Sequence, residues 1–106
     1  MQVHKLADMK GGWFVGDFAP SVLRTPAAEV AVKTYAAGAT EARHVHRVAH
    51  ELTLVLGGEV RMNGARYVSG DILLIEPGDS TDFEALTDVT TVVVKVPSVA
   101  GDKYPC

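Results

Sequence analysis

Three histidines and two glutamates lie within GATEARHVHRVAHELTLVLGG, residues 38–58. His44 and His46 are one residue apart, so on a β-strand they share a face, about 6 to 7 Å apart. Imidazole nitrogens bind transition metals at about 2 Å, and a carboxylate from a neighbouring strand completes a set of two histidines and one carboxylate. Glu51 opens the next strand-like run. The spacing therefore makes His44, His46 and Glu51 candidate ligands of a divalent metal ion.

The same residues allow an interpretation without an ion. His44 and His46 would then be a neutral pair, hydrogen-bonded inside a polar barrel. Glu51 would be a lone carboxylate in an apolar pocket, and burial raises the pKa of such a group. We then expect Glu51 to act as a catalytic acid or base. His50, which adjoins Glu51, is expected to face outward.

The elements that must position these side chains are short strands. No segment keeps a 3.6-residue apolar period over more than two turns, so helix is a minor component. Strand-like runs occupy residues 29–35, 42–46, 51–57, 59–63, 66–69, 71–76, 81–86 and 89–96. Many short strands at close spacing predict an all-β, antiparallel sandwich or barrel. Asn63-Gly64 predicts a type I′ hairpin.

Alternation along the strands predicts which side chains point into the barrel. It places Ala42, His44 and His46 on one face, with Arg43 and Arg47 on the other. Two guanidinium groups do not suit the interior of a small barrel, so we expect the histidines inside. The other inward positions are expected to form a largely apolar pocket with a few polar groups, suited to a small organic molecule: Thr53, Val55, Met62, Thr81 and Phe83.

Two lysines lie within strands, each flanked by apolar residues. We interpret Lys33 and Lys95 as part of a solvated face. The functional alternative is an ammonium in the pocket that pairs with an anionic substrate or with Glu51. Lys33 is preferred for that role, because its strand immediately precedes the histidine strand. The candidate substrate-binding residues are therefore Lys33, Thr53, Thr81 and Phe83.

The histidine segment resembles the first motif of the cupin family, G-x5-HxH-x3–4-E-x6-G. The matching residues are Gly38, His44, His46, Glu51 and Gly58, without gaps. The second cupin motif, G-x5-P-x-G-x2-H-x3-N, is matched in part. Gly70 and Gly78 are in place, whereas Glu76 stands at the proline position, Thr81 replaces the histidine and Ala85 replaces the asparagine.

The resemblance covers about residues 28–97 and implies a double-stranded β-helix, a jelly-roll-like barrel with an internal pocket. It also implies a metal set of two histidines and a glutamate from the first motif and a histidine from the second. Position by position, His44, His46 and Glu51 are present, and Thr81 stands where the fourth ligand is expected. Three ligands can still hold an ion; Fe, Mn, Zn or Ni would suit, and the identity stays open.

Length and charge limit the remaining possibilities. The 106 residues predict one domain, residues 1–106, with a barrel core at about 28–97 and an N-terminal segment, 1–27, packed on it. Ten basic residues against 13 acidic ones, without a basic stripe, argue against nucleic acid and membranes as partners. The single cysteine and the lack of a signal-like or spanning apolar run predict a cytoplasmic protein.

A homodimer is also expected, because small open-edged barrels commonly cover an exposed edge strand. The apolar segment 11–18, with Trp13, Phe14 and Phe18, is available for that contact.

Three functions follow as hypotheses. The first is a metal-dependent enzyme, whose ion polarises a carbonyl or enol, or activates dioxygen if it is Fe(II). The second is a metal-free isomerase or epimerase of sugar or keto-acid type, in which a histidine and Glu51 transfer protons. The third is a non-catalytic module that binds a small molecule in the same pocket.

Overall fold

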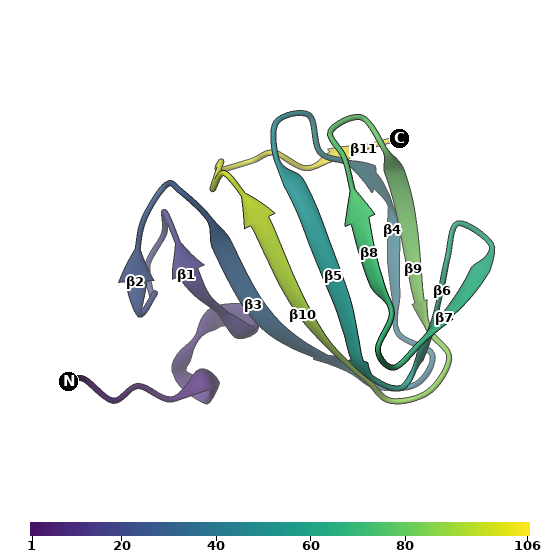
Figure 1. The fold of residues 1–106 in the computed structure, drawn as a ribbon, viewed down its shortest axis with the longest axis horizontal. Helices are drawn as coiled ribbons and strands as arrows, with labels where there is room; N and C mark the ends of the chain where they lie inside the picture. Colours follow the sequence, from purple (N-terminus) through teal and green to yellow (C-terminus); the bar gives the residue numbers. More distant parts are fainter.

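The computed structural model describes residues 1–106 and consists almost entirely of β-strands (Figure 1). The strands are β1 (Trp13–Gly16), β2 (Leu23–Arg24), β3 (Glu29–Tyr35), β4 (Thr40–Val45), β5 (His50–Gly57), β6 (Glu59–Met62), β7 (Ala65–Val68), β8 (Ile72–Ile75), β9 (Ser80–Ala85), β10 (Val89–Val96) and β11 (Tyr104–Pro105). Two 3-10 turns, η1 (Leu6–Asp8) and η2 (Lys10–Gly12), precede them. Neither turn has the length or the apolar composition of a membrane-spanning helix.

The strands form two sheets that enclose the interior. One sheet has the order β2-β1-β3-β10-β5-β8, and the other has the order β11-β4-β9-β6-β7. All pairs are antiparallel except β1 with β2. The expected all-β, antiparallel architecture is therefore confirmed. The predicted strands at 29–35 and 89–96 have the observed bounds, and the other six differ by at most two residues at either end.

The hairpin between β6 and β7 has the expected turn. Asn63 and Gly64 both have positive φ, 52° and 77°, and Met62 pairs with Ala65 across the turn. Positive φ at both central positions is the requirement of a type I′ turn, which glycine and asparagine meet at the least steric cost.

The interior is apolar at one end and polar at the other. The buried cluster consists of Val55, Val60, Met62, Ile75, Phe83, Ala85 and Val89. Along β5, Val55 belongs to this cluster, whereas Glu51 and Thr53 point to the same side nearer the start of the strand and face a cavity. The same strands that build the core therefore also carry polar side chains to the opposite end of the barrel.

The outer face of the six-stranded sheet is apolar and uncovered. Leu52, Leu56, Ile72, Leu74 and Val96 are between 41% and 67% exposed there. By contrast, two aromatic residues of the segment 11–18, Trp13 and Phe18, line the internal cavity. The homodimer stays a prediction, and the structure gives this segment a role inside the chain.

Candidate functional site

A cavity of about 570 Å³ opens at the polar end of the barrel. This volume lies within the range of pockets that hold small molecules, roughly 300 to 1,000 Å³. Strands β3, β4, β5, β9 and β10 form its walls, and the N-terminal segment and Lys103 complete them. Its ionisable lining residues are Lys10, Lys33, Lys95, Lys103, His44, Tyr35, Glu29, Glu41, Glu51 and Asp82. The cavity is thus more charged than the expected, largely apolar pocket.

The structure brings the predicted site residues together around this cavity. Lys33, Thr53, Thr81 and Phe83, the candidate substrate-binding residues, all line it, and so do His44 and Glu51. His46 is 3% exposed and lies behind the cavity wall, in contact with Glu51. Their roles in binding or catalysis stay predictions. His50 is exposed, as expected.

The interpretation of Lys33 and Lys95 as a solvated face is wrong. Both line the cavity, and their ammonium groups lie 5.9 and 5.1 Å from the centre of the Trp13 ring. Along β3 and β10, apolar residues lie on the outer face of the sheet. The residues that alternate with them, which include Lys33 and Lys95, therefore face inward. An alternation pattern fixes which residues share a face but does not say which face is inside.

The expected position of Ala42 is also wrong, because strand β4 contains a bulge. Glu41 pairs with Phe83 and His44 pairs with Thr81, so β4 has one more residue than β9 between these pairs. The extra residue reverses the alternation before His44. Ala42 is therefore exposed, and Glu41 takes the inward position.

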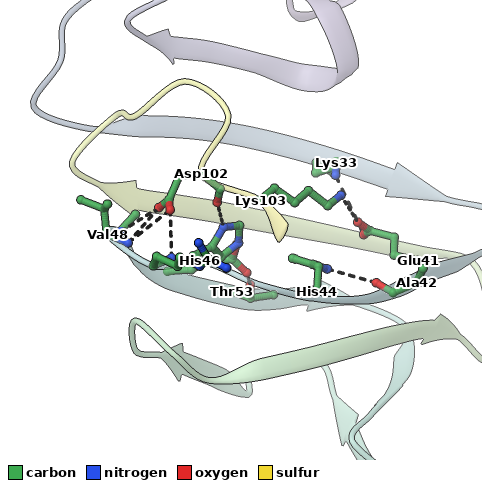
Figure 2. A network of polar contacts seen from close by, with 12 residues as sticks. Lys33, Glu41, Ala42, His44, His46, Val48, Thr53, Asp102 and Lys103 are labelled. Atoms are coloured by element: carbon green, nitrogen blue, oxygen red, sulfur yellow. Dashed lines mark hydrogen bonds and ion pairs between the residues drawn. The ribbon is translucent and has the colours of Figure 1, made fainter. Parts of the chain in front are cut away.

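Glu41 organises one side of the cavity. Its Oε1 accepts a hydrogen bond of 2.7 Å from the Tyr35 hydroxyl and lies 4.0 Å from Lys33 Nζ. Lys103 Nζ lies 3.9 Å from its other oxygen (Figure 2). Burial, followed by the hydrogen bond to Glu41, raises the pKa of Tyr35. Glu41 therefore engages two of the four cavity lysines.

His46 and Glu51 form the most buried polar contact of the site. Nε2 of His46 lies 3.2 Å from Oε1 of Glu51, although this buried nitrogen has no hydrogen-bond partner of regular geometry. The Thr53 hydroxyl donates to Oε2 of Glu51 at 2.9 Å. On the other side of the ring, Nδ1 of His46 contacts the main-chain carbonyl of Asp102 (Figure 2). Each polar atom of the ring thus faces an acceptor.

The neighbours of this pair favour its charged form. Contact with Glu51 raises the pKa of His46; burial and the charge of Lys95 oppose this rise, and the Asp102 carbonyl adds to it. Burial alone would raise the pKa of Glu51, but His46, the Thr53 hydroxyl and the charge of Lys95 together lower it. The expected raised pKa of Glu51 is therefore wrong, because its side chain is paired rather than isolated.

The three candidate metal ligands are not assembled as a metal centre. The His44 and His46 rings are 5.1 Å apart at an interplanar angle of 74°, and Nδ1 of His44 lies 3.1 Å from the Ala42 carbonyl (Figure 2). No group of three or more histidine, cysteine or acidic side chains is arranged to hold an ion. One feature does suit an ion: Nε2 of His46 is buried without a hydrogen-bond partner beside a carboxylate.

Several residues of the site lie outside the sequence predictions, among them Glu41 and Asp102. The sequence gives no signal for the bulge in β4, so it does not predict that Glu41 faces the cavity. Asp102 follows the last long strand, outside both motifs, and its 6% exposure comes from contacts with residues more than 50 positions earlier. Only the structure reveals these long-range contacts.

Comparison with known proteins identifies the fold. No protein-family model matches the sequence, and no curated protein matches it. Among solved structures, a protein from Klebsiella pneumoniae with a double-stranded β-helix domain is 28% identical, with a TM-score of 0.68 over 74% of this chain and 70% of that one. A cupin protein from Bacteroides fragilis is 25% identical, with a TM-score of 0.60 over 76% and 72% of the two chains.

A third similar structure is KdgF from Halomonas sp. It is 21% identical, with a TM-score of 0.64 over 71% of this chain and 74% of that one. At this level of identity the likeness concerns the fold. Together with the two sheets and their strand order, these structures confirm the double-stranded β-helix that the motif resemblance implied. The chain is therefore a member of the cupin superfamily.

Proposed function

We propose that this cupin binds a small anionic carbonyl compound in its cavity and transfers a proton on it. Glu51 is the group that exchanges the proton, and His46 supports it from behind. The observation that carries this proposal is the buried contact of 3.2 Å between His46 Nε2 and Glu51 Oε1 at the wall of a charged cavity. The carboxylate is ionised and faces the pocket, so it can accept a proton from a bound molecule; because its lowered pKa makes it a weak base, the proposed step also needs a cation to stabilise the enolate that forms.

Glu51 and His46 have different roles because they lie at different positions relative to the cavity. Glu51 lines the cavity, so its carboxylate can reach a bound molecule, whereas His46 is buried behind it. His46 has a raised pKa and Glu51 a lowered one, so the carboxylate is ionised at neutral pH. In the proposed step, Glu51 takes a proton from a carbon next to the carbonyl. The C–H electron pair becomes the enolate, whose charge forms on the carbonyl oxygen.

Lys95 supports an anionic ligand. Glu41 already engages Lys33 and Lys103, whereas Lys95 forms no ion pair and lies over the Trp13 ring at 5.1 Å. The Lys95 ammonium is close enough to Glu51 to lower its pKa, so it lies near the reacting carboxylate. It is therefore positioned to stabilise a ligand carboxylate or the developing enolate.

A divalent ion held by His44, His46 and Glu51 is a second candidate. It is favoured by the buried Nε2 of His46, which lies beside Glu51 without a hydrogen-bond partner of regular geometry. Thr81, which pairs with His44, stands in the place of the fourth cupin ligand and supplies only a neutral hydroxyl, so the ion would depend on three ligands. The His44 ring would have to leave the Ala42 carbonyl to join such a set.

Replacing Lys95 by glutamine is expected to weaken the binding of small 2-oxo acids about tenfold or more, because a charge-assisted hydrogen bond contributes about 1.5–3 kcal/mol. Trp13 is the only tryptophan and lines the cavity, so its fluorescence reports binding. The neutral amides of the same acids should bind both proteins equally. Lys5→Gln, at an exposed residue outside the cavity, is the control. Equal affinity of the acids for wild type and Lys95→Gln would contradict the anion-binding role.

Proton transfer is tested by hydrogen exchange at the carbon next to the carbonyl. In D₂O, the wild type should catalyse deuterium incorporation into a bound 2-oxo acid, followed by ¹H NMR, and Glu51→Gln should reduce the rate by at least about a hundredfold, the lower range for loss of a general base. Glu76→Gln, at an exposed residue outside the cavity, is the control and should retain the rate. Binding without exchange would leave a non-catalytic binding module.

The metal candidate is tested by elemental analysis. Protein purified without chelators and then incubated with Fe(II), Mn(II), Zn(II) or Ni(II) should retain one ion per chain if the site binds metal. The double variant His44→Ala/His46→Ala should retain none. Wild-type protein that stays below stoichiometric metal with all four ions would reject this candidate.

A further inference from the structure

Four neighbouring strands of the six-stranded sheet share an outer face without an acidic residue, a lysine or an arginine. Strands β3, β10, β5 and β8 lie side by side (Figure 1). Lys33, Lys95 and Glu51 point from these strands into the cavity, and Ile75 points into the core. Side chains alternate along a strand, so the residues between these point outward. We call the outward set the aliphatic face, which consists of ten aliphatic residues, two threonines and a histidine: Val30, Val32, Thr34, His50, Leu52, Leu54, Leu56, Ile72, Leu74, Thr90, Val92, Val94 and Val96.

The aliphatic residues of this face form one continuous surface. Leu52 lies between Leu74 of β8 and Val94 of β10. Ile72 and Leu74 are 67% and 56% exposed, so the surface is open to solvent. Single exposed aliphatic residues are common on proteins, whereas a continuous patch marks a site of interaction. The other aliphatic pairs on neighbouring strands are Leu54 with Ile72, Leu54 with Val92, Val92 with Val32, and Val94 with Val30.

The aliphatic face has the dimensions of a protein–protein interface. Four strands about 4.8 Å apart, and the residues Thr90–Val96 of β10 at about 3.3 Å each, give a rectangle of roughly 19 by 23 Å. Its projected area is about 440 Å², so two copies packed face to face would remove at least about 900 Å² from water. The accessible area exceeds this projection because side chains are not flat. The total therefore reaches the roughly 1,000 Å² that a specific interface needs.

A second copy of this chain is the partner that the chemistry of the face fits. An anionic membrane surface attracts lysine and arginine beside apolar residues, and the face has neither. A partner recognised through its charges would need charged groups on the face. A face without such groups is complementary to itself, because a twofold axis then places aliphatic residues opposite each other and opposes no like charges. Two sheets can pack in this way about 10 Å apart, with their side chains interdigitated.

The segment 11–18, which the sequence suggests for the dimer contact, is less suited to this role. Trp13 and Phe18 line the cavity. Gly12 lies so close to β3 that an added Cβ would be 1.9 Å from the carbonyl oxygen of Val32. The segment therefore packs on its own chain, whereas the aliphatic face stays open.

We propose that two copies of this chain form a dimer by packing their aliphatic faces against each other. Strands β10 and β5 lie in the middle of each face, so the dimer covers their outer sides. Their inner sides carry Lys95 and Glu51 to the cavity, which stays accessible because it lies on the other side of the sheet. The dimer is independent of the reaction proposed above.

The test is the mass of the purified full chain, measured by sedimentation equilibrium at micromolar concentrations. Wild type should have twice the chain mass of 11.3 kDa. Leu52→Lys/Leu74→Lys should raise the dissociation constant at least about a hundredfold, because the dimer would bury unpaired charges between its sheets. These side chains are 41% and 56% exposed, so we expect the monomer to keep its fold, which circular dichroism checks.

Val3→Lys/Leu6→Lys is the matched control. Both are exposed aliphatic residues before β1, outside the aliphatic face, and the variant adds the same two charges. It should remain a dimer, with a dissociation constant within about threefold of the wild-type value. A monomeric wild type would overturn the proposal, and so would a dimer of unchanged affinity in Leu52→Lys/Leu74→Lys.

A second variant keeps the test decisive if Leu52→Lys/Leu74→Lys does not fold. Leu74→Ser changes one exposed residue of the edge strand β8. It should weaken the dimer about tenfold or more, because each copy loses an aliphatic side chain that the interface would bury. An unchanged dissociation constant there would equally overturn the proposal. No ligand or turnover enters these measurements, so a monomeric wild type and a failed deuterium-exchange experiment are separate outcomes.

Discussion

The contact between His46 and Glu51 is the constraint on which the polar end of the barrel depends. Two ionised groups removed from water cost several kcal/mol each unless their charges and hydrogen-bonding atoms are compensated. Here the compensation comes from three directions: the pair itself, the Thr53 hydroxyl and the Asp102 carbonyl. Losing one partner would leave the other charge buried and unpaired. The surrounding strands and the C-terminal segment must therefore hold both side chains in register.

The need to compensate buried charges also explains why the interior has an apolar end and a separate polar end. Val55, Ala85 and Val89 close one end with aliphatic side chains, so the fold does not need the polar end for its core. A second carboxylate, Glu41, is compensated by Tyr35 and two lysines. The remaining strand lysine, Lys95, forms no ion pair, and an anionic ligand would provide one. The charges of the cavity thus explain why a small anion is the ligand class we favour.

The sequence predicted most of the fold because the physical signals are local. Alternation and turn residues located eight of the eleven strands and the Asn63-Gly64 hairpin. Motif spacing selected His44, Glu51 and Thr81, all of which line the cavity. The failures come from non-local features. Because of the bulge in β4, Glu41 rather than Ala42 takes the inward position, and alternation alone does not show that Lys95 faces inward. The shift of the Glu51 pKa was predicted in the wrong direction, because the sequence does not reveal that Glu51 is paired with His46.

The most direct measurement of the central claim is the pKa of His46, followed by NMR in the wild type and in Glu51→Gln. We predict a wild-type value above the ordinary 6.5, because Glu51 favours the imidazolium. In Glu51→Gln the carboxylate is lost while burial stays, so the pKa should fall below that of the wild type. Glu41→Gln should leave it close to the wild-type value. A wild-type pKa at or below 6.5 that does not change in Glu51→Gln would contradict the charged pair.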